Sequence, residues 1–359
     1  MINVTKPFST PLDEVKIYLD GIWERNWFTN NGPLVNELEL QLKSYLGVDH
    51  LLYLGNGTIA IQLGIKALGL KGKIITTPFS YIATTSSILW ENCVPVFADI
   101  DSETLNINPS EIEKLIDNEV TGILATHVFG NACDIDAIDQ IAKKYNLKVI
   151  YDGAHAFGST FRGNSLLNFG DVTTASFHAT KLFHTIEGGA VITRNSEVLK
   201  TLAFMRNFGH NGPEDFACIG INGKNSEMHA AVGLVNLKYV DDIVKRRKEL
   251  VAYYMTKLDG LKVKTIKIHP ECDWNCSYFP VIFDTEEQLL KAVKDLNNNW
   301  IYPRRYFYPS LSSLKFVGSH VNPVSSSVSP RILCLPLYHD LHLEEIDFII
   351  RILLRAQNY

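Results

Sequence analysis

Lys181 stands in a segment whose residue types and spacing suit covalent chemistry. The hydroxyl of Ser176 lies five residues before it, and the pair Gly188-Gly189 begins seven residues after it. β-Rich runs at 172–177 and 189–193 enclose the segment, which predicts a loop between two strands. A lysine in an enclosed site can lose its proton and form a Schiff base with an aldehyde. The segment therefore predicts an anchor for pyridoxal phosphate (PLP), with glycines that let the backbone pass close to a bulky ring.

The ring of PLP has two further requirements. Its nitrogen must stay protonated if the ring is to act as an electron sink, and a neighbouring carboxylate favours that state. Asp152 follows the apolar run 149–151, which predicts a buried strand. Tyr81 stands in the loop after another expected strand, 73–77, and can stack on the ring face. We therefore expect Asp152 at the ring nitrogen and Tyr81 against the ring.

The phosphate of PLP needs amide and hydroxyl donors. Asn56-Gly57-Thr58 lies where the expected strand 51–54 turns into a helical pattern. A helix N-terminus offers free N–H groups and a favourable dipole to an anion, and Ser176 can add a hydroxyl. Taken singly, such residues are most often ordinary turn formers and caps. Their order within one α/β pattern is what predicts a joint site.

Short β-rich runs alternate with helical patterns over the first part of the chain. The alternation predicts an α/β fold with a large, mostly parallel sheet that helices cover on both faces. Ligands gather outside the carboxyl ends of such strands. The expected helices include 58–68 and 134–145. The expected strands are 51–54, 73–77, 94–98, 122–126, 148–151, 173–177 and 189–193.

The pattern changes at Ser226. Apolar residues from Met228 to Tyr239 recur at helical spacing, which predicts one long amphipathic helix running toward the basic stretch 245–248. We expect that stretch to be a solvated helix face or a helix C-terminal charge. We predict a large domain over residues 1–240, with an N-terminal arm, and a smaller C-terminal α+β domain over residues 241–359.

Composition and charge argue against several classes of function. The 359 residues are 46% hydrophobic and 20% charged, as in soluble globular proteins, and the net charge of −5 offers no footprint for nucleic acid. No apolar run is long enough to cross a membrane, and residues 1–10 lack an apolar signal region. Cys272 and Cys276 are four apart without a second ligand pair, so no metal is expected. We expect a cytoplasmic protein with neither a nucleic-acid nor a membrane partner.

Several segments together carry a resemblance to a known family. The chain resembles the sugar-nucleotide aminotransferases of the DegT/StrS type, within the fold-type I PLP enzymes, over nearly its whole length. The segments around Asp152 and Lys181 are specific, whereas the phosphate turn alone is not. The matching segments are 27–33, 55–60, 77–84, 151–158, 176–189, 220–224 with 227–233, and 335–338.

The resemblance implies a role for each candidate residue. Lys181 and Asp152 would be catalytic, His155 would lie near the ring hydroxyl, and Asn222 would reach the cofactor phosphate of a neighbouring subunit. The active unit would then be a homodimer with shared active sites. The cofactor-binding set that the resemblance implies is Gly57, Thr58, Tyr81, Asp152, His155, Ser176, Lys181 and Asn222.

The resemblance also implies the reaction. L-Glutamate would give its amino group to the cofactor, which would pass it to a nucleotide-linked keto sugar. The closer resemblance is to the VioA-type branch, which converts dTDP-4-keto-6-deoxy-D-glucose to dTDP-4-amino-4,6-dideoxy-D-glucose for surface polysaccharides. Segments 177–181, 183–189, 221–224 and 305–309 carry it. The substrate cleft would include His178, His184, Lys224, Arg305, Tyr306 and Tyr308.

Some alternatives stay open at this point. Lys224 stands where the family often has Arg, and Asn225 where an apolar residue is usual, so the contacts of that loop are undecided. A 3-keto sugar or a UDP-linked substrate is also compatible with the sequence.

Three other functions are less favoured. A sugar dehydratase of this fold would have a histidine in place of Lys181. A non-catalytic regulatory protein of this fold is less favoured because the sequence shows nothing like a DNA-binding extension. A cysteine desulfurase needs a mobile cysteine, whereas Cys334 lies in the apolar run 332–335 and is expected in the core.

Overall fold

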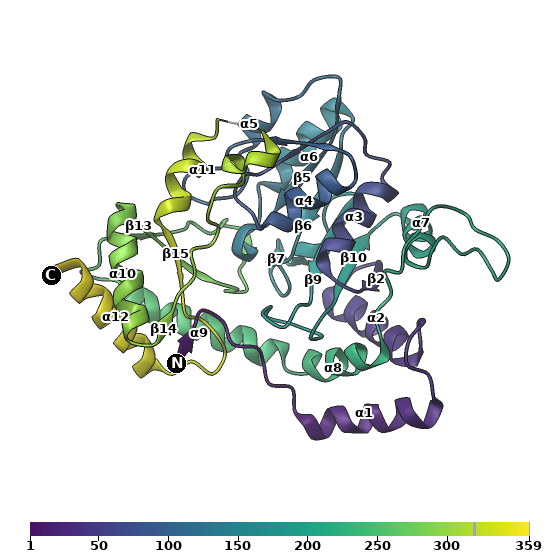
Figure 1. The fold of residues 1–359 in the computed structure, drawn as a ribbon, viewed down its shortest axis with the longest axis horizontal. Helices are drawn as coiled ribbons and strands as arrows, with labels where there is room; N and C mark the ends of the chain where they lie inside the picture. The colour runs from purple at the N-terminus through teal and green to yellow at the C-terminus, as the bar shows by residue number, and fades with distance from the viewer. Residues whose placement is uncertain (319–320, 359) are drawn as a thin grey trace.

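The computed structural model describes residues 1–318 and 321–358, and its larger part is built on a seven-stranded sheet (Figure 1). In order across the sheet, the strands are β2 (His50–Leu54), β10 (Gly189–Thr193), β9 (Val172–Ser176), β6 (Lys148–Asp152), β5 (Val120–Thr126), β3 (Lys73–Thr76) and β4 (Val94–Phe97). β10 is antiparallel to both of its neighbours, and every other pair is parallel. The predicted mostly parallel sheet is confirmed, and each of its seven predicted strands is found.

Helices cover both faces of this sheet because side chains alternate along each strand. In β2, Leu52 and Leu54 pack into one core, and Leu51 and Tyr53 pack into the core on the other face. The first core is covered by α3 (Gly57–Ala67), α4 (Ile82–Trp90) and α7 (Ser196–Arg206). The second is covered by α2 (Pro33–Leu46), α6 (Ile135–Tyr145) and α8 (Glu227–Leu237). The helices predicted at 58–68 and 134–145 are thus confirmed as α3 and α6.

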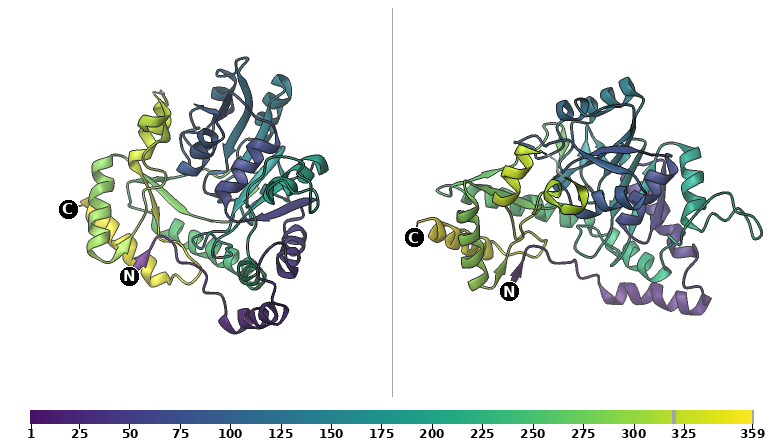
Figure 2. Two further views of the ribbon diagram at one scale, coloured as in Figure 1. Left: turned by 45° about the vertical axis from the view of Figure 1, so that its right-hand side comes forward. Right: turned by 45° about the horizontal axis from the view of Figure 1, so that its top comes forward.

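The smaller part of the molecule is α+β. An antiparallel sheet of β11 (Val263–Thr265), β13 (Phe279–Phe283) and β15 (Ile332–Leu335) packs with α9 (Val240–Lys257), α10 (Glu286–Asn298) and α12 (Leu343–Asn358). β1 (Ile2–Asn3) pairs with β14 (Ile301–Tyr302), so both chain ends lie on this side of the molecule (Figures 1 and 2). The remaining helices and strands are α1 (Leu12–Arg25), α5 (Pro109–Glu113), α11 (Pro323–Val328), β7 (Thr160–Phe161), β8 (Asn164–Ser165) and β12 (Cys272–Asp273).

The two parts share α9 and a third core. Val240 and Ile243 of α9 pack in the core of the large sheet, whereas Leu250 and Tyr254 pack in that of the smaller sheet. A separate cluster with Phe129 near its centre joins loops of the large sheet to the smaller one. The division at residues 240 and 241 stays a prediction. Within the described ranges, no helix combines the length and apolar character needed to cross a bilayer.

The prediction of one long helix after Ser226 is wrong, because the structure has two helices: α8 ends at Leu237 and α9 begins at Val240. Asp241 and Asp242 occupy the first turn of α9, where carboxylates stabilise the positive end of a helix. The basic stretch is also not wholly solvated. Arg247 is buried and donates hydrogen bonds to the carbonyl oxygens of residues 276 and 277 (3.2 and 3.0 Å), so it ties α9 to the segment before β13.

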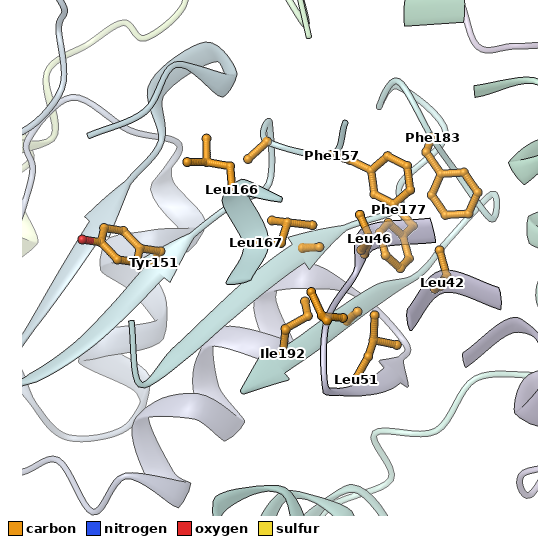
Figure 3. Packing of buried hydrophobic residues seen from close by; sticks show 14 of the residues in the cluster. Leu42, Leu46, Leu51, Tyr151, Phe157, Leu166, Leu167, Phe177, Phe183 and Ile192 are labelled. Atoms are coloured by element: carbon orange, nitrogen blue, oxygen red, sulfur yellow. The ribbon is translucent and has the colours of Figure 1, made fainter. Parts of the chain in front are cut away.

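An aromatic cluster lies beneath the loop between β9 and β10. The rings of Phe157 and Phe183 stack with centroids 4.5 Å apart, and Phe177 meets Phe183 edge-on at 5.0 Å (Figure 3). The backbone N–H of Phe177 donates to the Gly188 carbonyl (2.8 Å), and that of Ala179 donates to Ile186 (2.7 Å). Packing and backbone pairing therefore fix both ends of the loop that carries residue 181.

Replacing Phe183 by alanine should lower the free energy of unfolding by about 3–5 kcal/mol, because it empties a fully buried aromatic site. Urea unfolding followed by circular dichroism measures the loss. Trp90→Ala is the control, since that side chain is 78% exposed and its removal should change stability by less than about 0.5 kcal/mol. Equal losses in the two variants would contradict the packing described for the loop.

Candidate active site

A cavity of about 280 Å³ opens at the carboxyl edge of the large sheet. β10 is antiparallel to β9, so the loop that joins them turns back at the edge of the sheet where β6 and β9 end. Lys181 and Asp152 therefore face one cavity, although Lys181 lies in the β9–β10 loop and Asp152 at the end of β6. The sequence-predicted residues that line it are Gly57, Thr58, Tyr81, Asp152, His155, Ser176, His178, Lys181 and Tyr306.

Asp152 is the last residue of β6 and is buried. One carboxylate oxygen accepts a hydrogen bond from the Ala154 backbone N–H (3.0 Å), and the other accepts one from the Thr84 hydroxyl (2.7 Å). Thr84 in turn lies 2.7 Å from the Ser80 hydroxyl, which lies 3.0 Å from that of Thr126. This hydroxyl chain positions the carboxylate, and the sequence analysis did not find it.

The Lys181 amine faces the same cavity from the loop between β9 and β10. Desolvation lowers its pKa to about 8, although the negative charge of Asp152 acts in the opposite direction. The positive charge of Arg304 adds to the lowering. The amine can therefore be neutral near physiological pH, as a nucleophile and a base must be.

His155 and Tyr81 lie on the remaining walls of the cavity. The imidazole is buried between aromatic rings, stacks on Phe307 with centroids 5.8 Å apart, and leaves its Nδ1 atom without a partner in the described part of the chain. Burial holds the pKa of His155 well below its ordinary value, and the charge of Lys181 adds to the effect. Tyr81 is 49% exposed, so one side of its ring is open to a ligand.

The phosphate turn lies at the N-terminus of α3. The Asn56 side chain caps this helix by accepting the Ile59 N–H (2.9 Å). A Cβ atom on Gly57 would come within 3.0 Å of the Ser176 Cβ, so a side chain there would fill the space between turn and strand. The structure gives Gly189 a steric reason of its own, because a Cβ atom there would meet the Asn56 backbone at 2.4 Å, and the predicted approach of the glycine pair to a ring stays a prediction.

Four of the six predicted substrate residues lie outside this cavity, namely His184, Arg305, Tyr308 and, in the loop before α8, Lys224. His184 is buried, with its Nε2 atom 2.9 Å from the carbonyl oxygen of Phe8. Arg305 donates to Glu286 (2.5 Å) and to the carbonyl oxygen of residue 330, and its guanidinium carbon lies 3.5 Å from the ring centroid of Tyr308. Arg305 and Tyr308 thus contact each other, and the structure does not bring them to Lys181.

The loop before α8 places Asn222 and Lys224 away from the cavity of their own chain. Asn222 is exposed, whereas Lys224 donates to the Asn207 side chain (2.8 Å). Asn225 is buried and donates to Tyr53 Oη and to the Glu187 carbonyl (2.9 Å each). The buried side-chain amide of Asn225 therefore has hydrogen-bond partners, which explains how this position holds a polar residue where the family usually has an apolar one.

Arg304 lines the cavity and was missed. Its guanidinium lies over the Tyr306 ring, 4.4 Å from the centroid, while Arg305 points to the other side. Side chains alternate along an extended backbone, so residues 304 and 306 share one side. That alternation separates Arg304 from Arg305, but which of the two faces the cavity is set by the pairing of Arg304 with Cys334, which the sequence does not show. Within the described ranges, no group of three or more His, Cys, Asp and Glu side chains is arranged to hold a metal ion.

Comparison with known proteins places this geometry in a family. The model of the DegT/DnrJ/EryC1/StrS aminotransferase family matches residues 13–354. The chain belongs to this family. The predicted enzyme class, a transaminase, and the predicted fold are thereby confirmed.

Individual relatives agree with the family match. The chain is 40% identical over 356 residues to a dTDP-4-amino-4,6-dideoxy-D-glucose transaminase of Shigella dysenteriae, covering 97% of each chain. It is 36% identical to an Escherichia coli protein of the same name, covering 98% of each. Among solved structures, DesI in the presence of its TDP-sugar product superposes with a TM-score of 0.94 at 28% identity, covering 99% of this chain and 93% of that one.

Thr84→Val should lower the free energy of unfolding by about 1.5–3 kcal/mol at neutral pH, because it removes a hydrogen bond to a buried carboxylate. Thr85→Val is the matched control. Thr85 is equally buried, and its hydroxyl has no partner among the described residues. We expect it to be neutral or slightly stabilising in urea unfolding. A neutral Thr84→Val variant would rule out the positioning role of that hydroxyl.

Proposed function

We propose that the cavity binds PLP and that the protein transfers an amino group from L-glutamate to dTDP-4-keto-6-deoxy-D-glucose, giving dTDP-4-amino-4,6-dideoxy-D-glucose. The observation that carries the proposal is an amine of lowered pKa, Lys181, in one small cavity with a buried carboxylate, Asp152. The names of the two relatives support the sugar and the nucleotide.

The residues present fit PLP. Lys181 would take the aldehyde and Asp152 the ring nitrogen, and the unpartnered Nδ1 of His155 is free for a further polar group. The first amides of α3, with Thr58 and Ser176, would hold the phosphate. When bound, PLP supplies a reactive aldehyde and an electron sink.

The protein residues then have separate tasks. Lys181, once released from the cofactor by the amino donor, moves a proton between the donor carbon and the cofactor carbon as general base and acid. Its lowered pKa keeps the neutral amine available for the first transfer. Asp152, held by Thr84, places a negative charge in the cavity wall and would favour a protonated ring nitrogen.

A homodimer with shared active sites is part of the proposal. Exposed apolar side chains gather on α1 and on the loop between α7 and α8, and the loop also projects from the body of the protein (Figures 1 and 2). Asn222 is exposed on that loop and lines no part of its own cavity. Large exposed apolar patches are typical of interaction surfaces. The exposed residues are Leu12, Ile17, Trp23, Phe208, Phe216, Ile219 and Ile221.

The pH dependence of cofactor attachment tests the role of Lys181. Only the neutral amine attacks an aldehyde, and desolvation lowers the pKa of Lys181 to about 8. The rate of PLP incorporation into cofactor-free protein should therefore rise roughly tenfold per pH unit below about pH 8 and level off above it. Absorbance follows the reaction. Borohydride reduction and peptide mass spectrometry should then locate the label on Lys181, and a label on another residue would refute the assignment.

Mixing two variants tests the shared site. Lys181→Ala removes the amine, and Asn222→Glu places a negative charge where we propose that a partner's phosphate binds. If Asn222 acts across the interface, each hybrid dimer has one intact site, so an equilibrated mixture should regain roughly a quarter of wild-type activity. A mixture no more active than the separate variants would contradict the shared site.

A substrate panel tests the reaction itself. The holoenzyme is incubated with L-glutamate and with dTDP- or UDP-linked 3-keto and 4-keto sugars, and NMR identifies the product. We expect turnover of dTDP-4-keto-6-deoxy-D-glucose with the new amine at C4. Amination at C3, or of UDP-linked sugars alone, would replace the proposed substrate.

A further inference from the structure

Arg304 is a positively charged residue that lines the cavity, and the proposed function assigns it no role. Its side chain is exposed, and no hydrogen bond or ion pair engages its guanidinium within residues 1–318 and 321–358. Its neighbour Arg305 is instead paired with Glu286. An unpaired guanidinium on an aromatic platform is ready to bind an anion.

The position of Arg304 is fixed although its side chain is free. Its backbone N–H donates to the carbonyl of Cys334 (3.1 Å), and its carbonyl accepts the Cys334 N–H (2.8 Å). Cys334 is fully buried in β15. The Tyr306 side chain is only 7% exposed, and the centroid of its ring lies 4.4 Å from the guanidinium carbon of Arg304. The smaller sheet therefore presents one oriented cation to a site built mainly by the larger sheet.

The other charged groups that line the cavity already have partners or an assigned role. Asp152 accepts two hydrogen bonds, and Glu187 lies 3.6 Å from the His178 ring. Lys181 is assigned to the cofactor aldehyde. The charge of Arg304 also contributes to the lowered pKa of both Lys181 and His155, so it acts on the reacting centre. Arg304 is therefore the cation left for a substrate anion beside that centre.

We propose that Arg304 binds the α-carboxylate of the amino donor. The inference rests on the proposed function. In an amino acid, the α-carboxylate is attached to the carbon that bears the transferred amine, so it must lie beside Lys181. In a 4-keto sugar nucleotide, the diphosphate is on C1, across the sugar ring from the reacting carbon. A planar guanidinium can hold a carboxylate through two parallel hydrogen bonds.

The test separates the two half-reactions of the holoenzyme. Stopped-flow absorbance follows the reaction of the PLP form with L-glutamate, and then that of the pyridoxamine form with the keto sugar. The variants are Arg304→Gln, Arg304→Lys and, as a matched loss of charge outside the cavity, Arg305→Gln. Calorimetric titration with 2-oxoglutarate, which carries the same carboxylates, measures binding without turnover. Urea unfolding checks that each variant is folded.

Arg304→Gln should raise the glutamate concentration for half-maximal rate about 10- to 100-fold, the usual effect of losing a charged hydrogen bond. Arg304→Lys should lie between it and the wild type, because it keeps the charge but loses the planar fork. Binding of 2-oxoglutarate should weaken in parallel, while the half-reaction with the keto sugar changes little. Arg305→Gln should behave as the wild type toward glutamate.

Unchanged glutamate dependence in Arg304→Gln would overturn the inference and leave the proposed function intact. Weakening of the keto-sugar half-reaction alone would also overturn it, since Arg304 would then bind the diphosphate. If the wild-type holoenzyme gives no absorbance change with L-glutamate, the proposed donor fails, and the role of Arg304 fails with it.

Discussion

An amine and a carboxylate face one small cavity, and burial outweighs their attraction. Desolvation lowers the pKa of Lys181 while the charge of Asp152 opposes that shift, and the net result is a pKa of about 8. The balance requires both groups to be held in place. Thr84 and the Ala154 amide hold the carboxylate, and the aromatic cluster beneath the loop holds the lysine segment.

The reversed direction of β10 makes this arrangement possible. A loop that joined two parallel neighbours directly would have to cross the sheet, whereas the loop from β9 to β10 turns back at the carboxyl edge. Gly189 then lets the first residues of α3 approach β10 closely. The phosphate turn, the lysine loop and the end of β6 consequently meet at one place.

Much of this site follows from local sequence patterns. Apolar β-rich runs give the strands, and the carboxyl ends of parallel strands share an edge, so Asp152 and Ser176 could be placed there from sequence. Arg304 could not be chosen over Arg305, because only the alternation of an extended segment separates them and its register is set by pairing with Cys334. The break between α8 and α9 was missed because the apolar spacing continues across it. The roles of Thr84 and Asn225 depend on partners far along the chain.

The central claim is that Asp152 keeps a PLP ring nitrogen protonated opposite Lys181. The most direct measurement is the ¹⁵N chemical shift of ring-labelled PLP bound to the wild type and to Asp152→Asn. The account predicts a protonated nitrogen in the wild type and an unprotonated one in the variant. The same shift in both proteins would contradict it.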